Sequence, residues 1–179
     1  YNKGVATNIK LWNTDLFLSA SMAKIDYSGS ILTTGLHRTE SELLKKDSNL
    51  ARMIGGHLNY ENKGLQLGTT LLYYDYADSI KHSSQEYQQY YFSGKQNSVI
   101  SANASYLYKR MRVFTEVSMS QNKATASILG LQINLAYKTT LSASIRNYEK
   151  DYQNFYSNVL GVQSKVANEQ GFNCNFAHR

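Results

Sequence analysis

The sequence predicts an all-β protein of about nine antiparallel strands, because apolar and polar residues alternate along nearly every regular segment. Such alternation is typical of strands with one face in an apolar environment and the other in a polar one. The 179 residues include 15 Tyr and no Pro. Tyr is common in strands and at membrane interfaces, whereas Pro interrupts the hydrogen-bonded ladders of a sheet. Composition and periodicity therefore agree.

The strands follow one another along the chain with the same period of two. The alternating segments are 5–12, 16–23, 51–60, 65–74, 100–108, 112–119, 129–136, 141–146 and a ninth that begins near Gly171. In each, one face carries mainly Leu, Ile, Val, Ala, Met and Thr, and the other carries Gly, Asn, Gln and Ser. The first set suits lipid and the second a wet interior.

The connections alternate between short and long. Tight turns are predicted near 13–14, 61–64, 109–111 and 137–138, and longer connections at 27–50, 78–95 and 150–170, with a shorter one at 121–124. Short periplasmic turns and long external loops are typical of bacterial outer-membrane barrels. The sequence thus predicts an antiparallel transmembrane β-barrel segment.

Residues 1–179 are expected to form part of one barrel domain with no internal boundary. No stretch approaches the ~20 apolar residues of a membrane-spanning helix, and mean hydropathy is −0.46. Residue 1 already lies in strand-like sequence, and bacterial single-chain barrels have an even number of strands. We therefore expect the barrel to be incomplete at both ends of this sequence.

The charges predict loops and an interior rather than a nucleic-acid surface. The net charge is +6, but the sequence pattern places Lys and Arg mainly in predicted turns and loops, with Lys45-Lys46 and Lys109-Arg110 as the adjacent pairs. Arg112, Glu116 and Arg146 fall in strands, where they would be costly against hydrocarbon, so we expect them to be lumenal charges. They would fill the lumen as a network or take part in gating or solute selection.

No pattern predicts catalysis, a cofactor or a metal site. The four His residues are far apart, and Cys174 is the single cysteine. Two aromatic clusters, Tyr87, Tyr90, Tyr91, Phe92 and Tyr148, Tyr152, Phe155, Tyr156, favour a girdle or loop packing over stacking platforms for sugars or bases. We expect a protein that is not an enzyme.

The segment Thr39-Glu40-Ser41-Glu42 has the pattern of a capping box, which predicts a short helix through Lys46. The loop 27–50 would then order itself to shelter an edge or plug the mouth of the barrel. Alternatively the helix docks a partner, with Leu43 and Leu44 as anchors.

Two groups of residues resemble a known family. The first is Gly35-Leu36-His37-Arg38-Thr39 with Glu42 and Lys45-Lys46, then Gly55-Gly56 and Asn59-Tyr60; the second is Arg146-Asn147-Tyr148, Asp151-Tyr152-Gln153, Phe155-Tyr156 and Val166 to Gly171, with Tyr90-Tyr91 near Gly94 between them. They resemble the barrel region of Bacteroidota outer-membrane proteins in which a competence-type helix-hairpin-helix module precedes the barrel. The resemblance implies an outer-membrane location and a larger parent chain. It does not imply DNA binding by these residues, which contain no such module.

The expected function is that of a non-enzymatic outer-membrane scaffold or accessory subunit in transport, secretion or assembly. Its expected partners are outer-membrane lipid or lipopolysaccharide and other outer-membrane or periplasmic proteins. Two alternatives remain open. One is a diffusion pore or DNA-uptake conduit; the other is a soluble, Tyr-rich β protein that binds polysaccharide or nucleic acid.

Overall fold

A computed structural model describes residues 2–32, 37–81, 90–155 and 166–178 as one antiparallel sheet. Its elements are β1 (Asn2–Leu11), β2 (Thr14–Ile25), α1 (Glu40–Leu43), β3 (Asn49–Asn62), β4 (Leu65–Ile80), β5 (Gly94–Tyr108), β6 (Met111–Ser120), β7 (Thr125–Ala136), β8 (Thr139–Tyr148) and β9 (Glu169–His178). The all-β class and the number of strands are confirmed.

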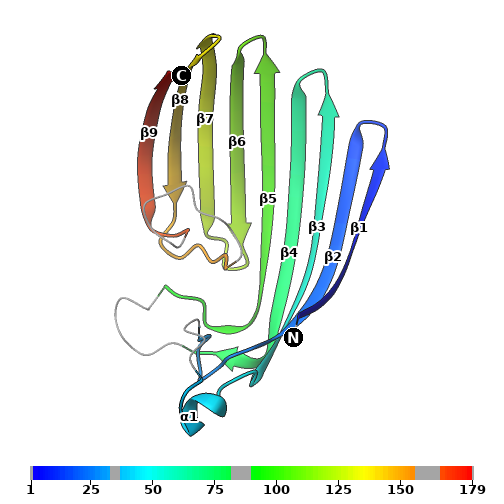
Figure 1. The fold of residues 1–179 in the computed structure, drawn as a ribbon, viewed down its shortest axis with the longest axis vertical. Coiled ribbons are helices and arrows are strands. Elements are labelled where there is room, and N and C mark those ends of the chain that lie inside the picture. Colours follow the sequence, from blue (N-terminus) through cyan, green and yellow to red (C-terminus); the bar gives the residue numbers. More distant parts are fainter. Residues whose placement is uncertain (1, 33–36, 82–89, 156–165, 179) are drawn as a thin grey trace.

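Each strand pairs with the strand that follows it in the chain, so the order across the sheet is β1 to β9. Figure 1 shows that the short turns gather at one end and the longer connections, together with α1, at the other. We call these the turn end and the loop end. β1 and β9 pair only with β2 and β8 among the described residues, so the sheet is not closed.

The boundaries differ from the prediction where side chains extend or stop an element. β3 and β4 run further toward the loop end, because the Asn49 side-chain amide accepts from the Asp78 N–H at 3.0 Å and donates to the Asp78 carbonyl at 3.2 Å. The helix is shorter than predicted, because it ends at Leu43. A tight turn follows it up to Asp47, whose φ is +52°. The first tight turn lies at 12–13, one residue earlier than predicted.

Bulky side chains on the inner face lie across glycines of the neighbouring strand. Phe114 pairs with Gly130, and a Cβ at Gly130 would stand 2.0 Å from the Phe114 ring. Arg146 pairs with Gly171 in the same way, with its guanidinium 2.5 Å from such a Cβ. Only glycine allows these side chains to lie flat on the sheet, so the glycines fix the packing of the inner face.

Two buried clusters cover the inner face toward the loop end. The larger contains Ala51, Tyr74, Tyr76, Ile80, Phe92 and Val99, and the smaller contains Ala124, Ala126, Tyr148, Tyr152 and Val166. Both join strand residues to residues of the longer connections. The loop end therefore has a packed core, while the turn end depends on the strand ladder.

Candidate functional site

The outward face of the sheet is an exposed band of apolar side chains. Pairing places the same alternate positions of all nine strands on this face. Its large exposed members include Val5, Ile9, Leu18, Met22, Ile54, Leu58, Leu67, Leu71, Ile100, Val113, Val117, Met119, Leu129, Ile145, Phe172 and Phe176. We call this surface the outward band. It is far more extensive than the apolar patches of ordinary soluble monomers.

The outward band contains no charged side chain among the described residues, and polar residues border it. At the loop end the outward positions become Lys3, Lys24, Arg52 and Asp75. On β8 the corresponding border position is Asn147, which pairs with Ser127 and Gln170. At the turn end, outward Tyr60, Tyr106 and Tyr108 lie beside the short turns, and Trp12 is almost fully exposed. The described charged side chains of this face therefore lie outside the apolar band.

Two threonine hydroxyl groups inside the outward band donate hydrogen bonds to the backbone. Thr69 Oγ1 donates to the Ser101 carbonyl at 3.0 Å, and Thr115 Oγ1 donates to the Ile128 carbonyl at 3.0 Å. A polar group facing hydrocarbon must find its hydrogen bond within the protein. These two threonines meet that requirement, so they do not make the band hydrophilic.

All three predicted lumenal charges lie on the opposite, inner face. Arg112 donates to Gln66 Oε1 at 3.0 Å and to Ser105 Oγ at 3.3 Å. Arg146 donates from Nε to Glu169 Oε1 at 2.6 Å, and both side chains of this ion pair are only 10% exposed.

Glu116 is exposed on the inner face and lines a hollow of about 250 Å³. It lies level with Arg146, since both pair with Ile128 of β7 from opposite sides. Arg112 is four residues nearer the turn end, or ~13 Å along the strand. The structure therefore places Glu116 and Arg146 on one row and Arg112 apart from them.

The segment 149–155 folds over the inner face and covers it at the loop end. The Tyr152 hydroxyl lies 2.6 Å from Ser118 Oγ. The Asn97 side chain, 1% exposed, donates to the Gln153 carbonyl at 2.9 Å, and Gln153 N–H donates to Ser120 Oγ at 3.3 Å. Three neighbouring strand positions thus hold this segment in place.

Aromatic rings complete the cover. Phe155 stands edge-on to Phe92 and Tyr74, with ring centroids 5.5 and 6.0 Å apart. Tyr74 also contacts Tyr76 at 6.0 Å. Phe92, Tyr148 and Tyr152 are buried in the two clusters of the inner face, and Phe155 packs against Phe92. The predicted cluster members Tyr87 and Tyr156 lie outside the described residues. The sequence did not reveal which way these aromatic loops fold.

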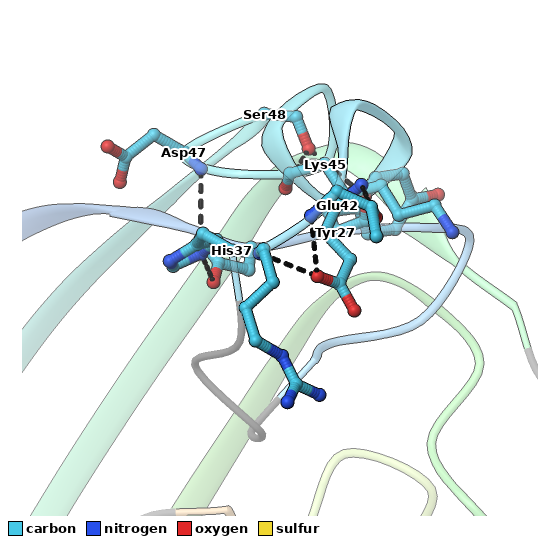
Figure 2. Close-up of polar contacts among 9 residues, drawn as sticks. Tyr27, His37, Glu42, Lys45, Asp47 and Ser48 are labelled. Atoms are coloured by element: carbon cyan, nitrogen blue, oxygen red, sulfur yellow. Dashed lines mark hydrogen bonds and ion pairs between the residues drawn. The ribbon is translucent and has the colours of Figure 1, made fainter.

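The connection 26–48 is ordered by the Asp26 carboxylate and by the predicted capping box (Figure 2). Asp26 accepts from the Asp47 backbone N–H at 2.9 Å, and His37 Nε2 lies 2.7 Å from its other oxygen. These contacts hold the pKa of Asp26 below its ordinary value, the Asp47 N–H contributing most.

The capping box is formed as predicted: Thr39 Oγ1 accepts from Glu42 N–H at 3.3 Å, and the Glu42 carboxylate accepts from Thr39 N–H at 3.1 Å and from Arg38 N–H at 2.7 Å. The two backbone donors lower the pKa of Glu42, with Arg38 contributing most. Leu43 and Leu44 are left 53% and 82% exposed on this ordered loop. They are available for the docking role predicted for them.

The histidines of the described residues have separate surroundings. His37 contacts Asp26, while His57 Nδ1 lies 2.9 Å from Thr70 Oγ1 and His178 Nδ1 lies 2.9 Å from Thr139 Oγ1. In the described part of the chain no three His, Cys, Asp or Glu side chains gather as a metal site. The same residues include no helix long and apolar enough to cross a membrane.

One prediction about charge placement was wrong. Lys and Arg were expected mainly in turns and loops outside the three lumenal candidates, but Lys3, Lys24 and Arg52 lie within β1, β2 and β3. The sequence did contain a signal for their position, because each lies an even number of residues from the outward apolar residues of its own strand.

A scan against protein-family models, a search of curated proteins and a search of solved structures found no match.

Proposed function

We propose that this chain forms part of a bacterial outer-membrane β-barrel that acts without catalysis, as a scaffold or accessory subunit in outer-membrane transport, secretion or assembly. The observation that carries the proposal is the outward band, which is exposed, apolar on all nine strands and free of charge among the described residues. In water such a surface would drive aggregation, whereas in a bilayer it is the required surface.

The height of the outward band supports the proposal. On β4 its outward run extends from Leu65 to Tyr73, eight steps of about 3.4 Å, or ~27 Å along the strand. With the strand tilted by about 40°, this corresponds to ~21 Å along the membrane normal. The apolar belt of outer-membrane barrels is about 25 Å tall. Outward Tyr60, Tyr106 and Tyr108 then lie at the level of an interfacial aromatic girdle.

The free edges of β1 and β9 support a larger assembly of strands. Each is a ten-residue strand with an unpaired edge among the described residues. Unpaired backbone groups are not tolerated in hydrocarbon, so a barrel wall must continue beyond both strands. The resemblance to the Bacteroidota proteins is consistent with such a larger barrel.

The covered inner face favours the scaffold over the pore or DNA conduit. Tyr152, Gln153 and Phe155 occupy the inner face at the loop end through buried hydrogen bonds and ring contacts. The inner ion pair Arg146–Glu169 is internally neutral, which does not favour a path for a polyanion. An open conduit would need to displace this packed segment.

The test uses the full-length protein in detergent and in planar bilayers. We expect heat-modifiable gel mobility, β-rich circular dichroism that requires detergent, and no steady large conductance. Monomeric behaviour without detergent would remove the membrane from the proposal. A large stable conductance would select the pore instead.

The orientation of the loops has its own test. We propose that the turn end faces the periplasm and the loop end faces outward, because short periplasmic turns are the rule in these barrels. With Cys174→Ser as background, Ser41→Cys should react with a membrane-impermeant maleimide on intact cells, and Asn62→Cys only after the outer membrane is opened. The reverse labelling pattern would show that the orientation is inverted.

A further inference from the structure

The outward-facing cations of the sheet are confined to three neighbouring strands. Among the described outward strand positions, Lys3 of β1, Lys24 of β2 and Arg52 of β3 are basic, and the corresponding loop-end positions of β5, β8 and β9 are Gln96, Asn147 and Gln170. All three cations lie at the loop-end border of the outward band. We call them the basic border.

The strand register brings the basic border together around Lys24. Lys3 pairs with Met22, which lies two residues before Lys24, and Lys24 pairs with Leu50, which lies two residues before Arg52. Lys24 is therefore a diagonal neighbour of both Lys3 and Arg52, at about 7–8 Å between backbones. Side chains as long as Lys and Arg can meet at one point across that spacing. A hollow of about 440 Å³ lies here, lined by Lys3, Met22, Ala23, Lys24, Asp47 and Leu50.

The charges of the hollow leave a small positive excess. Arg52 forms an ion pair with Asp75, to which its Nε donates a hydrogen bond at 3.0 Å. Neither Lys3 nor Lys24 forms an ion pair within the described residues, and Asp47 is the one acidic side chain that lines the hollow. Figure 2 shows the Asp47 carboxylate pointing away from His37. Two lysines thus face one carboxylate.

We propose that the basic border binds the phosphate of a membrane lipid whose acyl chains lie on the outward band. The inference rests on the proposed membrane function and adds the ligand. A single net positive charge is complementary to a phosphodiester, which carries one negative charge. The position at the edge of the apolar surface selects a lipid over a soluble anion, because Val5, Leu18 and Ile54 continue the surface below the hollow.

The test measures lipid retention by the purified full-length protein in mixed micelles of phosphatidylglycerol and phosphatidylcholine, using native mass spectrometry. We expect the wild type to retain phosphatidylglycerol preferentially. Lys3→Gln should reduce this preference about fivefold, and Lys3→Gln with Lys24→Gln about thirtyfold. Asp47→Asn should increase it, since it removes the opposing charge.

The control is Lys63→Gln with Lys138→Gln, which removes two exposed lysines at the turn end and should leave the preference unchanged. An equal loss in both double variants would mean a general charge effect and overturn the site. Displacement of the lipid by soluble glycerol phosphate would make it a free-anion site and overturn the lipid assignment. A wild type that needs detergent but shows no headgroup preference refutes this inference alone, whereas a detergent-independent wild type refutes the proposed function.

Discussion

A charge placed in the outward band distinguishes a bilayer-facing surface from a water-facing one. Leu71 is the position of choice: it lies on β4 near the middle of the band, is 58% exposed, and pairs with Gly56 and Ile100 on its two sides. Because the side chain packs against little protein, Leu71→Arg introduces a charge without opening a cavity. The change in folding free energy then shows whether this surface faces lipid or water.

The two environments give different magnitudes. At the bilayer midplane of a transmembrane barrel, an arginine on the lipid face costs about 2–4 kcal/mol of folding free energy. On a water-exposed surface the same substitution stays within about 0.5 kcal/mol. The separation corresponds to a factor of ten or more in the folding equilibrium, since about 1.4 kcal/mol is tenfold.

The assay is urea titration of the full-length protein in phosphatidylcholine vesicles, with the folded fraction measured by heat-modifiable gel mobility. Asn147→Arg is the matched control, because Asn147 is an exposed outward position at the polar border of β8, where the cost falls to about 0–1 kcal/mol. A Leu71→Arg variant as stable as Asn147→Arg would refute the assignment of the outward band to hydrocarbon.

Three further predictions concern the loop end. Tyr152→Phe removes the hydroxyl that meets a buried serine at 2.6 Å, so it should cost about 1–3 kcal/mol and speed amide exchange in the segment 149–155; unchanged exchange would contradict the cover described for it. The pKa of Asp26 is lowered from its ordinary value of 3.8, so its stabilisation of the loop is complete above that value and is lost as pH falls below about 4. Asp26→Asn should reduce this acid-induced loosening, measured by limited proteolysis, and leave the part that comes from Glu42, whose pKa is also lowered. Leu43→Ser with Leu44→Ser should leave stability unchanged, because both side chains are exposed, but should reduce co-purification of outer-membrane proteins if they anchor a partner.

The fold could be predicted from the sequence because a single pattern determines most of it. Alternation assigns each strand residue to a face, and turn length fixes which strands are neighbours. The faces predicted for Leu67, Gln66 and Arg146, for example, are those that the register produces. The capping box of Thr39 and Glu42 was likewise predictable, since both members are close in sequence.

The rest depends on contacts between residues far apart in the sequence. Nothing near Tyr152 indicates that it meets Ser118, 34 positions away, or that the Gln153 carbonyl meets Asn97, 56 positions away. The basic border is a different case. The alternation along each strand places Lys3, Lys24 and Arg52 on the outward face. To predict that they lie close together, the register of three strands must also be known, and turn lengths alone fix that register only approximately.

The two ends of the sheet are stabilised by different kinds of contact. On the inner face, buried rings such as Tyr74 and Phe92 pack at the loop end, whereas the turn-end half is occupied by polar contacts such as Arg112 with Gln66. Polar contacts of exposed groups add little to stability. The turn-end half must therefore be held by its strand ladder and by the medium against the outward band. Leu67 and Tyr106 of that half are exposed. In the proposed barrel, a bilayer would stabilise the turn-end half by removing these side chains from water, whereas the buried loop-end clusters would persist without that contribution.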